Sequence, residues 1–296
     1  MNRGIIYAVT AYIIWGFIPV YIKQLNNVPA PQLLSHRIVW SFVSLLIVIL
    51  TMSRISTFGK SIRNAGVLKI YFMAAILIGI NWFTYVWAVG AGFIVEASLG
   101  YFINPLISVL LGVFFLRERL RIWQWVPILI AGTGVAFLTF VYGKIPWIAL
   151  VLAFSFGFYG MVKKKGELNS LDGLSLETGI LLMPALIYIF LMELNGRGVV
   201  FHSGVSTILL LMGAGVITVV PLLLFASAVK KIALTTIGIL QYIAPTLQFL
   251  VGVVIYKEPF NLSKLTGFGI IWFALIIFGI ESWIHHQAQP FVTDIE

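Results

Sequence analysis

The 296-residue chain contains no cysteine, and few of its residues carry a charge. Without cysteine it can form neither a disulfide bond nor a metal site with thiolate ligands. Charged residues make up 10% of the chain, whereas a soluble domain carries about 25%, so this chain cannot cover a surface that faces water. Hydrophobic residues make up 60%, and the mean hydropathy is +1.04. These values predict an integral membrane protein.

The sequence also lacks the common motifs of hydrolases and ATP-driven pumps. It contains no HExxH zinc motif, no GxSxG nucleophile motif and no GxxxxGK[ST] phosphate loop. We therefore expect neither an enzyme nor a cofactor. His285 and His286 stand together in the C-terminal tail without further ligands nearby, so no metal site is expected there. The net charge of +9 comes from Lys and Arg residues that lie mostly between apolar runs, which argues against nucleic acid as a partner.

Apolar runs long enough to cross a membrane follow one another along nearly the whole chain. About 20 apolar residues in a helix cross a hydrocarbon core of roughly 30 Å. The sequence therefore predicts an all-α integral membrane protein with ten transmembrane helices. The predicted spans are 4–23, 32–52, 70–90, 93–116, 122–142, 145–162, 174–193, 206–228, 233–256 and 265–284.

The positions of Lys and Arg predict the orientation of the chain. Ten crossings place both termini on one side of the membrane. Segments on that side carry 13 of the 19 Lys and Arg residues, segments on the opposite side carry 5, and Arg37 lies inside a span. Because cytoplasmic segments are enriched in Lys and Arg, both termini are expected in the cytoplasm.

The sequence repeats itself at an offset of 140 residues, as the segments 101–118 and 241–258 show. Each predicted unit, 1–143 and 144–296, holds five spans, and an odd number of spans inverts the second unit relative to the first. Inverted repeats are typical of secondary transporters, whose substrate site lies between the repeats near the midplane. The matched pairs are Pro105 with Pro245, Gly112 with Gly252, and Glu118 with Glu258.

Pro105 and Pro245 are predicted to break their helices at the transport site. Proline in a helix interior costs about 3 kcal/mol because it removes a backbone donor and crowds the preceding turn. In a membrane this is acceptable where the freed groups face a watery cavity or neighbouring helices. Asn104 and Gln241 lie close by and favour the cavity, although a kink that serves only packing is the alternative.

Four ionisable residues fall within or at the edge of the predicted spans: His36, Arg37, Glu96 and Glu177. A charge at the bilayer centre costs at least about 2.5 kcal/mol. Arg37 and Glu96 lie at similar depth near the external side and are expected to pair. Such a pair is either a salt bridge that holds two helices together or part of a gate or of a binding site for a zwitterionic solute. In the second case Glu96 or His36 could also take up a proton. We interpret Glu177 as an interfacial residue.

Aromatic and amide side chains recur in the same spans at helical spacing. Such faces bind organic cations or aromatic solutes by cation–π contact and stacking, although single Trp and Tyr residues also form interfacial belts. Asn81 is the most specific member, since it is an amide about ten residues into a span. The set comprises Tyr12, Trp15, Asn81, Trp82, Tyr85, Trp87, Tyr101, Tyr159 and Tyr242.

Several stretches resemble one known group of membrane proteins. They are "AYIIWGFIPVYIK" (11–23), "HRIVWSF" (36–42), "GINWFTYVWAV" (79–89), "EASLGYFINPL" (96–106), "FSFGFYGMVKKK" (154–165) and "QYIAPT" (241–246). With these stretches the chain resembles the EamA-type family of the drug/metabolite transporter superfamily, and within it the RarD group of chloramphenicol-sensitivity permeases. The resemblance implies two inverted five-helix repeats in a bacterial inner or plasma membrane that move small organic solutes, often outward.

The chain departs from the family pattern in one respect. EamA repeats usually carry Gly-Glu at the end of the fourth helix of each repeat. Here the pairs are Arg117-Glu118 and Lys257-Glu258, so the glutamate is kept and the glycine is replaced.

The leading hypothesis is a secondary permease, working by alternating access, with a small-molecule solute, membrane lipid and optionally a proton as partners. The alternative is a non-transporting membrane sensor or a lipid-binding assembly protein. A central chamber lined by Trp15, Asn81, Tyr101 and Tyr242 would favour transport, whereas a dry apolar core at these positions would favour the alternative.

Overall fold

A computed structural model describes residues 3–25, 27–52, 64–91, 94–141, 147–255 and 262–288 of the chain. Nearly all of these residues are helical, as expected for an all-α protein. Eight helices are long and apolar enough to cross a membrane, and they coincide with the first eight predicted spans. They are α1 (Arg3–Ile22), α2 (Ala30–Thr51), α4 (Ala65–Gly90), α5 (Ile94–Leu116), α6 (Ile122–Val141), α7 (Trp147–Lys165), α8 (Ser170–Leu194) and α9 (Val205–Val229).

The last two predicted spans coincide with shorter or only partly described helices, so ten crossings remain a prediction. The ninth predicted span, 233–256, is interrupted. It consists of α10 (Leu234–Leu240), α11 (Ile243–Leu250) and a π-helical turn (Val251–Ile255). The tenth coincides with α12 (Leu262–Ala288).

The two prolines that were expected to break their helices behave differently. Helix α5 runs through Pro105, so the expected break there is wrong: the lost donor does not end the helix. In the ninth predicted span the helix is interrupted, but at Gln241 and Tyr242, before Pro245. Pro245 is the third residue of α11, in the first helical turn, where an N–H has no intrahelical partner and proline is tolerated.

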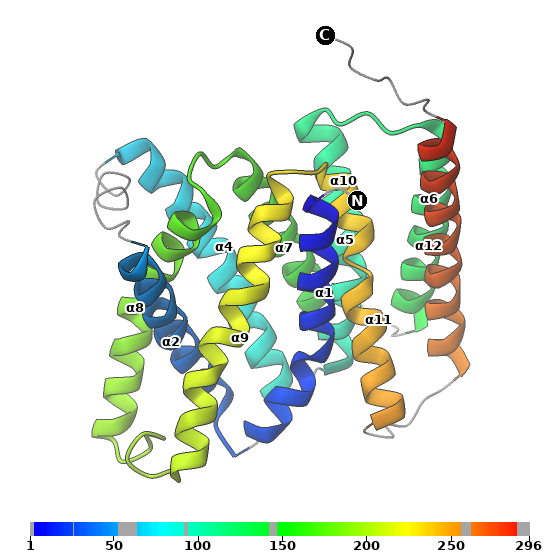
Figure 1. Cartoon of the computed structure of the whole chain (residues 1–296). Helices are drawn as coiled ribbons and strands as arrows, with labels where there is room; N and C mark the ends of the chain where they lie inside the picture. Colours follow the sequence, from blue (N-terminus) through cyan, green and yellow to red (C-terminus); the bar gives the residue numbers. More distant parts are fainter. Residues whose placement is uncertain are drawn as a thin grey trace.

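The described helices interlock across the two predicted units. Figure 1 shows helices that run alternately up and down, with α6 and α12 side by side at one edge. All the most extensive helix contacts join an element before residue 144 to one after it, so neither segment forms a separate core. These contacts are α5–α7, α6–α12, α2–α9, α2–α8, α1–α9, α4–α7 and α5–α10.

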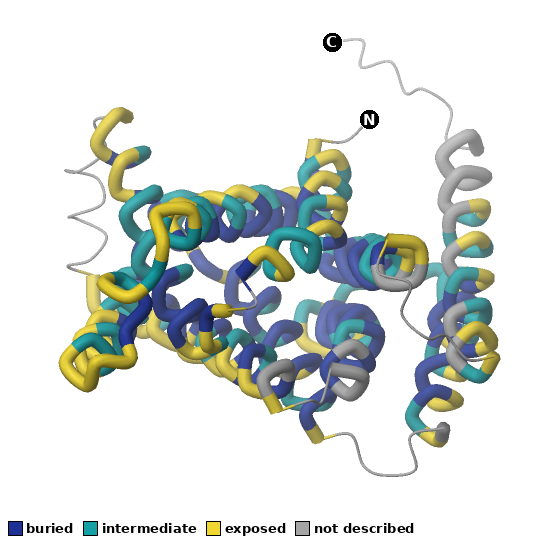
Figure 2. Tube along the Cα trace, turned by 90° about the horizontal axis from the view of Figure 1, so that it is seen from below, coloured by how far each residue is buried: buried dark blue, intermediate teal, exposed yellow. Residues whose placement is uncertain are grey.

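The outer surface of the described part is apolar. Buried residues lie on the inward faces of the central helices, and exposed residues lie on their outward faces (Figure 2). The outward side chains include Phe72, Phe114 and Phe140, the last of which is 84% exposed. Exposed apolar surface of this extent is unfavourable in water but fits lipid.

Glu118 joins the two segments at the end of α5. Its carboxylate accepts hydrogen bonds from the backbone N–H groups of Leu234 (2.7 Å) and Thr235 (2.9 Å), at the start of α10. It also lies 3.3 Å from the Lys164 ammonium. Burial acts to raise the pKa of Glu118, but the two N–H donors and the Lys164 charge outweigh it and lower the pKa below its ordinary value. The carboxylate therefore stays charged at neutral pH.

Arg117, the residue that replaces the family glycine, has a φ of 55°. This left-handed conformation suits glycine and costs other residues about 1–2 kcal/mol. The turn brings Glu118 back over α5, where a Cβ atom on Gly112 would lie 2.6 Å from the Glu118 carboxylate. Glycine would adopt this turn without strain, whereas Arg117 adopts it at a cost.

We expect Arg117→Gly to stabilise the protein by about 1 kcal/mol, because it relieves the strain of a positive φ. Arg119→Gly is the matched control, since Arg119 is an exposed arginine in the same joint with no positive φ. Thermal unfolding in detergent measures both variants. Equal or lower stability of Arg117→Gly relative to Arg119→Gly would contradict the explanation.

Gly215 lets α9 approach α2 closely. A Cβ atom on Gly215 would lie 2.4 Å from the carbonyl carbon of Trp40, and the neighbouring Ser41 hydroxyl donates to the Gly215 carbonyl at 3.4 Å. Because Trp40 would be met through its backbone, no side-chain rotation relieves the clash. Small residues at such contacts allow membrane helices to approach. Gly132, by contrast, has no described atom within 4 Å of the position that a Cβ atom would take.

Gly215→Ala should destabilise the protein by about 1–3 kcal/mol, the usual cost of overpacking. Gly132→Ala adds the same methyl group where there is open space and should be neutral or slightly stabilising. Thermal unfolding of both variants in one detergent provides the comparison. Similar stabilities for the two would show that the α2–α9 approach is not tight.

Candidate functional site

A cavity of about 100 Å³ lies among the described helices and is shared by both segments of the chain. A buried water needs roughly 10–15 Å³ measured in this way, so the space holds several waters or a small organic molecule. Its lining residues are Tyr12, Trp15, Ile18, Ile22, Arg37, Asn81, Trp82, Tyr85, Tyr101, Asn104, Phe156, Thr218, Leu222, Gln241, Ala244, Pro245 and Gln248.

Aromatic rings form much of the cavity wall. Trp15 of α1 lies 5.6 Å from the ring of Tyr12 and 5.8 Å from Phe156 of α7, measured between ring centroids. Tyr85 of α4 and Tyr101 of α5 meet edge to face at 5.5 Å. These separations are typical of stable aromatic pairs, so the rings hold one another in place. The cavity therefore offers preformed apolar surface to a ligand.

Arg37 brings a positive charge to the cavity from α2. Its Nε donates to the Thr218 hydroxyl at 3.0 Å, and its guanidinium carbon lies 5.6 Å from the centre of the Trp82 ring. The Thr218 hydroxyl itself donates to the Ala214 carbonyl at 2.7 Å, which fixes it as an acceptor for Arg37. No carboxylate among the described residues pairs with Arg37.

Amide side chains surround the aromatic rings, and most are anchored. Asn81 donates to the Leu152 carbonyl at 2.9 Å and to the Ser155 hydroxyl at 3.0 Å. Gln248 donates to the Trp15 carbonyl at 3.0 Å. Anchored amides bind α4 to α7 and α11 to α1, so they also hold the two segments together.

Two fully buried polar atoms of cavity-lining residues have no hydrogen-bond partner among the described residues. They are the hydroxyl of Tyr12 and Oδ1 of Asn104. Tyr12 is 0% exposed and Asn104 is 2% exposed. Nearly all buried polar groups in proteins are hydrogen-bonded, so such exceptions call for an explanation. Both residues line the cavity, so a ligand or water there is a candidate partner for each atom.

The interruption between α10 and α11 places further polar groups at the cavity. Gln241 lies at the interruption, and Ser108 of α5 donates to its Oε1 at 3.3 Å. Pro245 lines the cavity one turn later, and Gln248 lies seven residues after Gln241, close to two helical turns. That spacing was the signal for Gln248, which the predicted site omitted. Thr218 and Phe156 were also omitted, because a single hydroxyl or ring in an apolar helix carries no distinctive pattern.

Several predicted site residues do not line this cavity. Tyr242 and Pro105 line a smaller apolar cavity of about 10 Å³, between α5, α6, α10 and α12. His36 is buried, and its Nε2 has no partner among the described residues. The side chain of Glu96 lies outside the described residues, so its pairing with Arg37 remains a prediction. The predicted chamber residues Trp15, Asn81 and Tyr101 line the large cavity, whereas Tyr242 does not.

Comparison with known proteins identifies the family. The model of the EamA-like transporter family matches residues 2–140 and again residues 144–280. The chain belongs to the EamA-like transporter family. It is thus a multi-pass membrane protein of a transporter family, as the resemblance implied.

Relatives of this EamA family member extend over nearly its full length. "Uncharacterized transporter YojE" of Bacillus subtilis is 48% identical over 281 residues, covering 94% of this chain and 93% of the relative. "Protein RarD" of Escherichia coli is 42% identical over 283 residues, covering 95% of each. One solved crystal structure, 17% identical, superposes with a TM-score of 0.71 and covers 94% of this chain and 98% of the other. At that identity it shows the shared fold alone.

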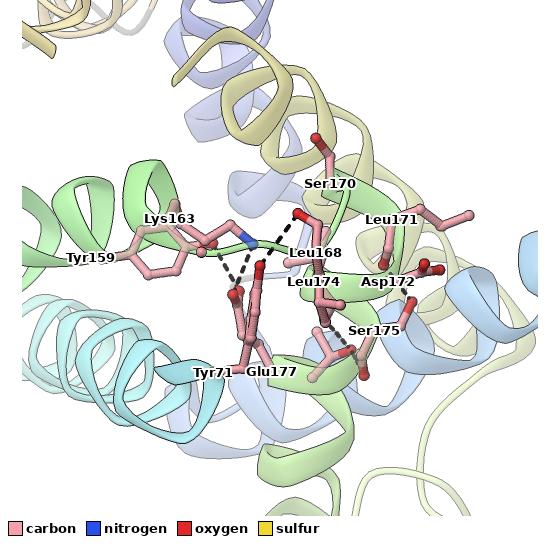
Figure 3. A network of polar contacts seen from close by, with 12 residues as sticks. Tyr71, Tyr159, Lys163, Leu168, Ser170, Leu171, Asp172, Leu174, Ser175 and Glu177 are labelled. Atoms are coloured by element: carbon pink, nitrogen blue, oxygen red, sulfur yellow. Dashed lines mark hydrogen bonds and ion pairs between the residues drawn. The ribbon is translucent and has the colours of Figure 1, made fainter. Parts of the chain in front are cut away.

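A buried ion pair lies among α4, α7 and α8, apart from the cavity (Figure 3). Lys163 of α7 and Glu177 of α8 meet at 2.8 Å, with exposures of 2% and 0%. The Tyr159 hydroxyl donates to the second carboxylate oxygen at 3.0 Å. The Lys163 ammonium also lies over the ring of Tyr71, 5.4 Å from its centre. The interpretation of Glu177 as an interfacial residue is therefore wrong: Lys163 and Tyr159 satisfy it inside the protein.

This cluster also ties α4 to the second segment. The Tyr71 hydroxyl donates to the Leu168 carbonyl at 3.3 Å. Its ring lies where Cβ atoms on Gly166 and Gly173 would stand, since both would lie 2.6 Å from Tyr71 atoms. The two glycines thus form the slot that receives the ring.

Lys163→Met should destabilise this EamA protein by about 3–5 kcal/mol, because it leaves the Glu177 charge buried without its partner. The double variant Lys163→Met/Glu177→Leu removes both charges and should recover most of that loss. Unfolding by SDS titration from mixed micelles measures each variant. A double variant no more stable than Lys163→Met would show that the pair acts through more than mutual neutralisation.

Proposed function

We propose that this EamA family member is a secondary transporter that exports small polar or amphipathic organic solutes across the bacterial cytoplasmic membrane by alternating access. The observation that carries the proposal is the cavity shared by both segments, which combines aromatic walls, a cation and two polar atoms without a described partner. Relatives in Bacillus subtilis and Vibrio cholerae are named as transporters, which supports transport and gives no reason to expect catalysis. The two matches of one family model support the proposed repeat.

The contacts at the two ends of the bundle are suited to act as gates. On the side that we assign to the cytoplasm, Glu118 holds the start of α10 and Lys164. On the opposite side, Gln32 donates to the Arg197 carbonyl at 2.7 Å, and Tyr21 donates to the Leu210 carbonyl. Each contact joins the first segment to the second. Opening one set while the other stays closed would expose the cavity to one side at a time.

Single-cysteine labelling tests the proposal without knowledge of the solute. The native chain contains no cysteine, so every introduced thiol is unique. Ala244 lines the cavity and is small, and Ala244→Cys should react with the impermeant reagent sulfonatoethyl methanethiosulfonate in both right-side-out and inverted vesicles. Alternating access predicts reaction from both sides because each side reaches the cavity in turn.

Two variants serve as controls for this labelling. Leu45→Cys replaces a residue that is 0% exposed in the core and should not react from either side. Lys165→Cys is exposed at the proposed cytoplasmic end and should react only in inverted vesicles, which checks the orientation and shows that the reagent does not cross. No reaction at Ala244→Cys would favour a non-transporting bundle, and reaction from one side alone would indicate a blind receptor pocket.

A further inference from the structure

The charge that the described residues bring to the large cavity is positive. Arg37 is the one ionisable Lys, Arg, His, Asp or Glu side chain among the described residues that line it. The Trp82 ring, which could have received an organic cation, already lies beneath the Arg37 guanidinium at 5.6 Å. A cationic solute would therefore meet a like charge, which is unfavourable in a low-dielectric site. Of the two ligand classes expected from the aromatic faces, the structure disfavours the organic cation.

The hydrogen-bonding capacity of Arg37 is only partly used. The described residues accept from Nε, through the Thr218 hydroxyl, and make no hydrogen bond to the two terminal nitrogens. A guanidinium presents a planar fork of donors that matches a carboxylate in two parallel hydrogen bonds. No described carboxylate pairs with Arg37, so an anionic ligand would gain both the hydrogen bonds and the neutralisation of this charge.

The rest of the cavity indicates what the anion is attached to. Trp15, Tyr85, Tyr101 and Phe156 supply apolar ring faces, which suit a flat apolar body. A single cation and a space of about 100 Å³ suit a small monoanion better than a multiply charged phosphate ester. Oδ1 of Asn104 and the Tyr12 hydroxyl, which have no partner in the described part of the chain, indicate one further hydrogen-bonding group on the ligand.

We infer that the transported solute is a small organic monocarboxylate with a ring-sized apolar body and one further hydrogen-bonding group. The inference rests on the proposed function and names the substrate class of the same site. Arg37 holds the carboxylate, the aromatic rings hold the apolar body, and Asn104 and Tyr12 hold the remaining polar group.

A panel of matched probes tests the assignment on the purified full-length protein. The probes 3-phenyllactate, 3-phenyllactamide and 1-amino-3-phenylpropan-2-ol share the ring and the hydroxyl, and differ in a carboxylate, a neutral amide or an ammonium group. Binding is followed by isothermal calorimetry at pH 7. The carboxylate should bind at least about tenfold more tightly than the amide, in line with a charge-assisted hydrogen bond, and the amine more weakly than both.

Two variants locate the binding groups. Arg37→Gln keeps a hydrogen-bonding side chain without the charge, and should bring the affinities for the acid and the amide within about twofold of each other. Arg121→Gln is the matched control, because Arg121 pairs with Glu281 at 2.8 Å away from the cavity, and it should keep the preference. Asn104→Leu should weaken 3-phenyllactate but leave 3-phenylpropanoate, which lacks the hydroxyl, unchanged. Unfolding of each variant is measured alongside to show that it is folded.

Three results would overturn the inference: a wild-type protein that binds acid and amide equally or prefers the amine, a preference that survives Arg37→Gln, or no binding of any probe at millimolar concentration. Tighter binding of inorganic phosphate than of 3-phenyllactate would also overturn it. None of these results bears on the labelling of Ala244→Cys, which needs no solute. The proposed substrate class and the proposed transport function can therefore be refuted independently of each other.

Discussion

Hydrocarbon offers no hydrogen bonds, and this constraint organises the whole molecule. A polar side chain in a span is therefore stabilised by a partner inside the protein. Asn81 donates to the carbonyl of Leu152, and Arg37 donates to the hydroxyl of Thr218. Glu177 accepts hydrogen bonds from Lys163 and Tyr159. Each partner lies on a different helix, so satisfying the polar groups also determines which helices must touch.

The cavity follows from the same constraint. Polar side chains that point away from lipid line the cavity together with aromatic rings from several helices. The rings pack against one another across the helices and leave space between the polar groups. Most amides there are anchored to backbone or hydroxyl groups, whereas Asn104 Oδ1 and the Tyr12 hydroxyl have no such anchor among the described residues. The contrast separates the polar groups that build the site from those that are available to a ligand.

Hydropathy predicted the first eight helices because each one must be apolar along its own length, a property that a single segment carries. The sequence was less informative where structure depends on contacts between segments. The interruption before Pro245 was placed at the wrong residue, since proline marks a disturbed turn but not the end of the helix that precedes it. Glu177 was misjudged because Lys163, its partner, reads as one of three lysines in a polar joint. Arg37, Asn81 and Tyr101 were identified as candidates because polar or amphipathic side chains in oily spans are costly enough to stand out.

The interlocking of the two segments has a consequence for how the protein is made. The ribosome delivers α1 to α6 to the membrane before α7 exists, yet α5 packs chiefly against α7, and α2 against α8 and α9. Before the later helices are made, Asn81 lacks its partner on α7 and Arg37 lacks its partner on α9. The face of α2 that packs against α9 is likewise uncovered. The early helices are therefore in the membrane before their main packing partners are present. Final packing therefore requires the helices of the second segment.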